Sequence, residues 1–163
     1  MKNESNAGAA GRRAFIAGAG ALLLAAHLPA SAAGVPVEVW KDPDCGCCKD
    51  WVAHLEANGF KVKVKDSGRE TVAKKLGVEG KYRSCHTALV GGYAIEGHVP
   101  AREVFRLLKE KPKAVGLSVP GMPVGSPGMD SPLYGGRQDA YEVLLLARDG
   151  SAKVYQRYEG KKS

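Results

Sequence analysis

The chain has 163 residues, with 24 lysine and arginine residues against 17 acidic ones and a formal net charge of +7. That length suffices for one domain with its own hydrophobic core and an additional segment. The positive residues are scattered along the sequence and are not gathered with aromatic residues, so we expect no nucleic-acid partner.

The N-terminal segment has the features of a bacterial export signal. Two adjacent arginines, Arg12 and Arg13, precede an apolar run, and Ala30–Ala32 matches an Ala-x-Ala cleavage site. The run is short and diluted by glycine, whereas a membrane span takes roughly 20 apolar residues. We therefore expect a twin-arginine signal peptide over residues 1–32, a periplasmic mature domain over residues 33–163, and no stable membrane anchor. An uncleaved anchor is the alternative.

After residue 32, apolar and polar residues alternate in some segments and recur at helical spacing in others. Alternation predicts strands, and helical spacing predicts helices. The order of these elements is that of a thioredoxin-like α/β fold, a layered sheet with flanking helices. In chain order we expect a strand at 35–40, a helix from Cys48 to Asn58, a strand at 60–65, a short helix at 69–76, a hairpin of 87–90 and 93–96, and a helix from Pro100 that ends before Pro112.

The C-terminal part of the chain has a different composition. Residues 116–139 are rich in glycine and proline. A loop of this length inside a compact domain usually serves a function or is disordered. Residues 141–147 and 152–158 flank an Asp-Gly turn, and they predict a C-terminal β-hairpin.

Three of the four cysteines, Cys45, Cys47 and Cys48, lie between the first predicted strand and the first predicted helix. A helix N-terminus favours thiolates through its unpaired N–H groups and its dipole. Asp44 is expected to cap this helix. In the predicted fold, the segment that enters the hairpin passes beside this point. We therefore expect Cys85 to lie next to the other three cysteines.

Four thiolates at one place match the chemistry of Cu(I), a soft ion that prefers sulfur. This ion accepts two or three thiolates, and bridging sulfurs can hold several ions. A Cys-x-Cys-Cys run packs its sulfurs too closely for one tetrahedral Zn²⁺, whose ligands are usually spaced as C-x₂₋₄-C pairs. We therefore favour a multinuclear Cu(I)–thiolate cluster held by Cys45, Cys47, Cys48 and Cys85 over a mononuclear zinc site.

The main alternative is thiol–disulfide exchange by Cys45 and Cys48, which form a Cys-x-x-Cys pair at a helix start. Cys47 and Cys85 would then be surplus thiols beside the exchanging pair. Thioredoxin-like oxidoreductases also keep a cis-proline at the entry to the hairpin, where this chain has Cys85-His86-Thr87. A purely structural disulfide framework fits less well, because the cysteines are clustered.

Two histidines accompany the cysteines. His86 follows Cys85 directly, and His98 lies just before the last predicted helix. Because imidazole is a common copper ligand, we treat both histidines as candidate ligands. A surface or capping role is the alternative for each.

Three further side chains are weighed as ligands and set aside. His54 is expected on a solvated helix face. The thioether of Met122 or Met129 could bind Cu(I) weakly, but gap filling by a flexible apolar side chain is favoured for both.

Four motifs in this chain resemble those of the CopG-type periplasmic copper-resistance family: Trp40–Cys48, Ser84–Thr87, Gly97–Pro100 and Gly116–Met129. The resemblance extends over residues 35–158. It implies a thioredoxin-like fold, a copper cluster bridged by the four cysteines, and a role in copper tolerance with Cu(I)/Cu(II) redox cycling as a candidate activity. Sequestration of copper without turnover fits the resemblance equally well. We therefore expect copper ions and other periplasmic copper-handling proteins as partners.

Overall fold

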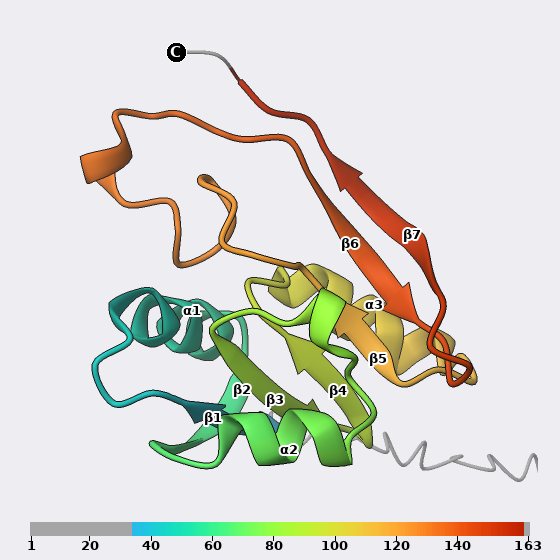
Figure 1. Cartoon of the computed structure of the whole chain (residues 1–163). Helices are drawn as coiled ribbons and strands as arrows, with labels where there is room; N and C mark the ends of the chain where they lie inside the picture. Colours follow the sequence, from blue (N-terminus) through green and yellow to red (C-terminus); the bar gives the residue numbers. More distant parts are fainter. Residues whose placement is uncertain (1–33, 162–163) are drawn as a thin grey trace, which may run out of the picture. The chain divides into compact units, whose positions relative to one another are not determined.

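The computed structural model describes residues 34–161, and the predicted signal peptide lies outside the described residues. Within this range the strands form a single sheet that has helices on both faces (Figure 1). None of the described helices is long and apolar enough to cross a membrane.

The sheet has seven strands in the order β2-β1-β3-β4-β5-β6-β7. The β1–β2 and β4–β5 pairs are parallel, and all other neighbouring strands are antiparallel. All the predicted strands are present, which confirms the α/β fold class. The bounds are β1 Val35–Lys41, β2 Phe60–Lys65, β3 His86–Val90, β4 Tyr93–Glu96, β5 Gly116–Ser118, β6 Tyr141–Leu146 and β7 Ala152–Tyr158.

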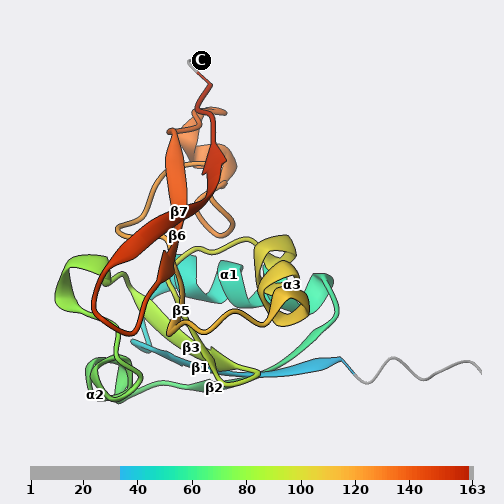
Figure 2. The ribbon, with the colours of Figure 1, turned by 90° about the vertical axis from the view of Figure 1, so that its right-hand side faces the viewer.

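Three α-helices cover the sheet. They are α1 Gly46–Ala57, α2 Arg69–Lys75 and α3 Ala101–Glu110. Helices α1 and α3 lie on one face and α2 lies on the other (Figure 2). Trp51 and Leu55 of α1 join Leu107 of α3 in the main core. Because burying one leucine contributes about 1.5–3 kcal/mol, these contacts hold α1 firmly against the sheet.

Strand β4 contributes to two cores. Ile95 belongs to the main core, whereas its neighbour Ala94 packs in a second cluster with Ala73 of α2 and Leu146 of β6. Successive side chains of a strand point to opposite faces of the sheet. Both faces of the sheet are therefore covered at β4.

The β3–β4 hairpin turns at Gly91 and Gly92, as the sequence predicts. Their φ angles are 55° and 85°. A type I′ turn requires positive φ at both central residues, which glycine adopts without steric cost. The turn fixes the register of the hairpin, and the opposite, open end of the hairpin carries Cys85 and His98.

Strand β5 lies inside the segment that the sequence predicts as a loop, so that prediction is wrong for residues 116–118. The strand pairs with β4 on one side and with β6 on the other, and it joins the C-terminal hairpin to the main sheet. A β-carbon on Gly116 would overlap the backbone of Ala94. Gly116, which indicated a loop, therefore permits a close approach of two strands. In addition, a strand of three residues is too short to show the alternation of apolar and polar residues.

Two helices begin at residues other than those predicted. Helix α1 begins at Gly46, ahead of Cys48, and α3 begins at Ala101, so that Pro100 stands just before the helix. Apolar spacing marks the first turn of a helix poorly, because the N–H groups of that turn have no intrahelical partner. The earlier start of α1 places two cysteines in its first turn.

Candidate metal centre

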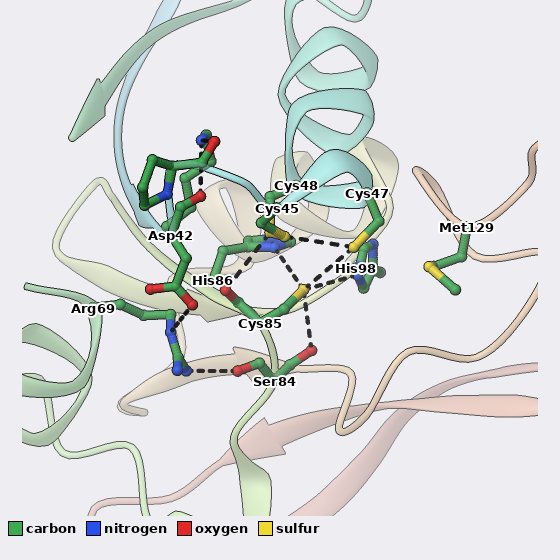
Figure 3. The surroundings of a disulfide bond; sticks show 12 residues. Asp42, Cys45, Cys47, Cys48, Arg69, Ser84, Cys85, His86, His98 and Met129 are labelled. Atoms are coloured by element: carbon green, nitrogen blue, oxygen red, sulfur yellow. Dashed lines mark hydrogen bonds and ion pairs between the residues drawn. A yellow bond between two sulfur atoms is a disulfide. The ribbon is translucent and has the colours of Figure 1, made fainter. Parts of the chain in front are cut away.

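Two segments that are distant in the sequence meet at the N-terminus of α1 (Figure 3). Cys45 is the N-cap residue of α1, and Cys47 and Cys48 lie in its first turn. Strand β3 pairs antiparallel with β1. Because the cysteine segment follows β1 and Cys85 precedes β3, this pairing brings Cys85 beside the other three cysteines, as the sequence predicts.

The four sulfur atoms form one group in which all lie within 4.8 Å of one another. Cys47 Sγ is 3.6 Å from Cys45 Sγ and 3.9 Å from Cys85 Sγ. Cys48 is buried, whereas the other three cysteines are partly exposed. The partial exposure leaves a route by which an ion can reach the sulfurs.

Cys45 and Cys48 form a disulfide bond, with their Cα atoms 5.3 Å apart. Cys47 and Cys85 are free thiols. This is the Cys-x-x-Cys pairing that the sequence offers as an alternative, and it leaves two of the four sulfurs able to act as thiolates. The expected set of four thiolates therefore exists only when this disulfide is reduced.

The Cys85 thiol lies in surroundings that oppose its ionisation. Burial raises the pKa of Cys85 to about 12, and the negative charge of a neighbouring Cys47 thiolate adds to the rise. Hydrogen bonding from the Ser84 hydroxyl acts in the opposite direction. At neutral pH the thiol keeps its proton until a metal cation replaces that proton.

His98 is oriented with one ring nitrogen toward Cys85. Its Nε2 is 3.1 Å from Cys85 Sγ, and its Nδ1 is 2.8 Å from the carbonyl oxygen of Pro127. A carbonyl oxygen can only accept a hydrogen bond, so Nδ1 carries the proton of the neutral ring. Burial lowers the pKa of His98, which favours that neutral form. The lone pair of Nε2 therefore faces the sulfur, in the state that a metal ligand requires.

His86 is fully buried beside Cys85. Its Nδ1 is 3.3 Å from Cys85 Sγ, and its ring centroid is 4.3 Å from that of Trp51. Burial lowers the pKa of His86 well below the ordinary value, and nearby His98 lowers it further. The Nε2 of His86 is buried and has no hydrogen-bond partner among the described residues. Such an atom is rare in folded proteins.

The structure thus brings together all six predicted site residues. The donor atoms of Cys85, His86 and His98 also lie within 4.8 Å of one another. Cys85 belongs both to this group and to the group of four sulfurs. It is the point at which the sulfur and imidazole donors meet.

Glu96 holds the Cys85 segment in place, although the sequence did not predict it as a site residue. It is fully buried, and its two carboxylate oxygens accept hydrogen bonds from the Ser84 N–H at 2.8 Å and the Thr87 hydroxyl at 2.7 Å. Burial raises the pKa of Glu96. The one signal in the sequence was a carboxylate at a strand end two residues before His98.

Arg69 connects the two cysteine-bearing segments. Its guanidinium donates to the Ser84 carbonyl at 2.8 Å and lies 3.9 Å from the Asp42 carboxylate. The Asp42 carbonyl accepts the N–H of Cys45 at 3.1 Å. The predicted capping role of Asp44 is wrong, because Cys45 occupies the N-cap position and no side chain caps α1.

The Gly/Pro-rich loop packs on the first turn of α1. Gly128 has a φ of 83°, and a β-carbon on it would collide with the backbone of Cys47 and Trp51. Met129, the next residue, is buried, whereas Met122 is 53% exposed. The loop therefore covers one side of the candidate metal centre.

His54 is not a solvated residue, contrary to the prediction. It is half-buried, and its Nε2 accepts the N–H of Ala101 at 3.0 Å. Burial lowers the pKa of His54, so the ring stays neutral and can accept. The histidine thus pairs one of the free N–H groups at the start of α3. This contact joins two helices, and spacing within one helix could not reveal it.

Comparison with known proteins places these features in a family. The family described as "Protein of unknown function, DUF411" matches residues 82–129. Two solved structures, described as forms 1 and 2 of copper resistance protein copG, are each 48% identical to this chain. They cover 78% and 77% of this chain and 99% and 98% of their own chains, with TM-scores of 0.72 and 0.70.

The chain belongs to the CopG copper-resistance family. Membership in the CopG family confirms the resemblance that its motifs indicate, and the CopG structures share its mixed α/β fold. The segment matched by the family description contains Cys85, His86 and His98. No curated protein matches the sequence.

Proposed function

We propose that this chain is a periplasmic copper-binding protein for copper resistance, and that its reduced form holds several Cu(I) ions bridged by Cys45, Cys47, Cys48 and Cys85. The observation that carries the proposal is the convergence of four sulfurs from two distant segments within 4.8 Å. The description of both 48% identical structures as a copper resistance protein supports the choice of copper.

The spacing of the sulfurs favours shared ions. Two sulfurs that bind the same ion, each at about 2.3 Å, can be at most about 4.6 Å apart. The Cys45–Cys47 and Cys47–Cys85 separations of 3.6 and 3.9 Å fall inside this limit. Once reduction of the Cys45–Cys48 bond frees Cys45, Cys47 could share one ion with each neighbour at these separations, which is the geometry of a bridging thiolate.

The imidazoles broaden the range of copper states that the site can hold. Thiolates favour Cu(I), whereas imidazole also accepts Cu(II). Because His86 and His98 both lie at Cys85, an ion in that position meets both kinds of donor. This arrangement supports Cu(I)/Cu(II) cycling as part of the proposed function.

The proposed location rests on the signal-like pattern of residues 1–32. In the periplasm the protein would exchange copper with other copper-handling proteins of that compartment. Fractionation of cells that carry the full chain tests this placement, with Arg12→Lys and Arg13→Lys together expected to keep the protein in the cytoplasm.

Anaerobic titration of the fully reduced protein with Cu(I) tests the cluster. We expect more than one copper per chain, with copper–sulfur and short copper–copper distances in the X-ray absorption spectrum. Cys85→Ser should reduce the stoichiometry, whereas Ser67→Ala, at an exposed turn residue, should leave it unchanged. Saturation at one copper or less in the unaltered chain would refute the cluster.

The Cys45–Cys48 disulfide favours one second function, thiol–disulfide exchange. Insulin reduction by the metal-free protein separates the two functions. Strong turnover that survives Cys47→Ala would support exchange, because that thiol has no role in the Cys45–Cys48 couple. We expect weak turnover, since Cys85-His86-Thr87 stands where thioredoxin-like oxidoreductases keep a cis-proline.

A further inference from the structure

The Cys45–Cys48 disulfide divides the candidate metal centre into two halves. One half holds the two sulfurs that are joined to each other and cannot act as thiolates. The other half holds the free thiols, Cys47 and Cys85. Both imidazoles contact Cys85, so every remaining strong donor lies in this second half.

The free thiols are already spaced for one tetrahedral ion. Two thiolates bound to one tetrahedral Zn²⁺ at about 2.3 Å lie about 3.8 Å apart. The Sγ atoms of Cys47 and Cys85 are 3.9 Å apart. An ion could bind between them without any movement of the backbone.

The imidazole nitrogens lie slightly closer to Cys85 Sγ than they would if all of them bound one tetrahedral ion. A sulfur and a nitrogen on one tetrahedral Zn²⁺ lie about 3.5 Å apart. The distances to Cys85 Sγ are 3.1 Å from His98 Nε2 and 3.3 Å from His86 Nδ1. Each ring needs to withdraw from Cys85 by only a few tenths of an ångström, and the Pro127 carbonyl already fixes the proton of His98 on the far nitrogen. Cys47 is grouped with the other cysteines and not with the imidazoles, so its free side chain must turn toward them to complete the set of four donors.

The charge of this donor set suits a divalent ion. Two thiolates neutralise the charge of one M²⁺, and two neutral imidazoles add none. A partly buried site with no net charge avoids the large cost of an unpaired buried charge. A tetrahedral set of two sulfurs and two nitrogens is typical of zinc.

We propose that the disulfide form of the protein binds a single divalent ion of the zinc type through Cys47, Cys85, His86 and His98. The disulfide then determines how many ions the centre holds, one when Cys45 and Cys48 are joined and several Cu(I) ions when they are reduced. Only this contrast with the reduced form rests on the proposed copper function.

Titration of the full chain with Co²⁺, a spectroscopic substitute for Zn²⁺, tests the proposal. The protein is first shown to contain two free thiols, and the titration is carried out without oxygen or reductant. We expect the visible spectrum of tetrahedral cobalt with sulfur-to-cobalt charge transfer, saturating at one ion per chain and reversed by Zn²⁺. No tetrahedral spectrum in this form would overturn the proposal.

Variants assign the ligands. Cys85→Ser should weaken the sulfur-to-cobalt band, because only the Cys47 thiolate remains, and His98→Ala should weaken binding by at least about tenfold. His54→Gln is a matched histidine change on α1 and should leave the spectrum unchanged. The double variant Cys45→Ser, Cys48→Ser should keep the one-ion spectrum, and loss of that spectrum in a folded double variant would overturn the proposal.

The two proposals fail independently. One Co²⁺ per chain in the disulfide form with no more than one Cu(I) in the reduced form would support this site and refute the copper cluster. Several Cu(I) ions in the reduced form with no tetrahedral Co²⁺ in the disulfide form would support the copper cluster and refute the single-ion site.

Discussion

Cys85 Sγ and His98 Nε2 lie 3.1 Å apart across the open end of the β3–β4 hairpin. Cys85 precedes β3 and His98 follows β4, so the hairpin register sets their separation. The carbonyl of Pro127, which belongs to the Gly/Pro-rich loop, fixes the orientation of the ring. A donor pair from one hairpin is thus held ready by a third segment of the chain.

Alkylation of Cys85 should be slow at neutral pH. Burial raises its pKa from 9.0 to about 12, which lowers the reactive thiolate fraction about 1,000-fold. We expect iodoacetamide to modify Cys85 at least about 100-fold more slowly than an ordinary thiol at pH 8, with the rate rising about tenfold per pH unit. Peptide mass spectrometry of timed samples measures the rate. A rate that levels off below pH 9 would contradict the raised pKa.

Replacement of Glu96 should destabilise the protein and loosen the Cys85 segment. Glu96→Ala leaves the partly buried Ser84 N–H and the buried Thr87 hydroxyl without their acceptors, at a cost of about 2–4 kcal/mol. Glu96→Gln keeps one acceptor and should cost less. Urea unfolding measures the loss.

The control for this pair is Glu56→Gln, at an exposed position of α1. It should change the free energy of unfolding by less than about 0.5 kcal/mol. An equal effect of the buried and the exposed replacement would show that Glu96 does not hold the segment.

Gly128→Ala should displace the Gly/Pro-rich loop from α1. Its φ of 83° is costly for alanine, and the new β-carbon would meet the backbone of Cys47 and Trp51. We expect a loss of about 1–3 kcal/mol and faster alkylation of Cys47. Gly121→Ala is a matched control, because Gly121 also has a positive φ but has no neighbour in the way. Equal alkylation rates in the two variants would mean that the loop does not shield the thiol.

Acid should weaken the fold below pH 6.5. Burial lowers the pKa values of His54, His86 and His98 in the folded protein, whereas the unfolded chain takes up protons near pH 6.5. The contribution of the three neutral histidines to the free energy of unfolding is therefore complete above pH 6.5. It is lost as the pH falls toward their pKa values in the folded protein. Between pH 7.5 and 5.5 we expect a net loss of about 1–4 kcal/mol in unfolding free energy. Glu96, whose pKa is raised, acts in the opposite direction.

Urea unfolding of the metal-free protein at both pH values measures this dependence. His54→Gln should show a smaller drop than the unaltered chain, because one of the three titrating groups is removed. An unfolding free energy that is constant or rises on acidification would contradict the lowered pKa values of the three histidines.

The approach of Cys85 to the other cysteines could be predicted from the sequence, because it follows from the order of the elements. Once β1 and β3 are neighbours, the segment after one and the segment before the other must lie side by side. The hairpin turn was equally predictable, since Gly91 and Gly92 supply the required backbone angles.

Other features depend on contacts that no local pattern encodes. Glu96 looks like an ordinary strand end, and only the tertiary fold shows that Ser84 and Thr87 surround it. Gly116 indicates a loop until its contact with Ala94 is known. The bond between Cys45 and Cys48 depends on redox conditions as well as on spacing, so the sequence could offer it only as an alternative.

The pairing of β5 with β6 also has a consequence for access to the candidate metal centre. Ser118 lies opposite Leu144, so residues 119–140 leave the sheet and return to it at neighbouring strands. The loop on this side of the candidate metal centre is therefore tethered at both ends and cannot swing clear in the manner of a free tail. In the proposed function, ions would therefore enter and leave through the partly exposed side of the centre, while the tethered stretch keeps the other side closed.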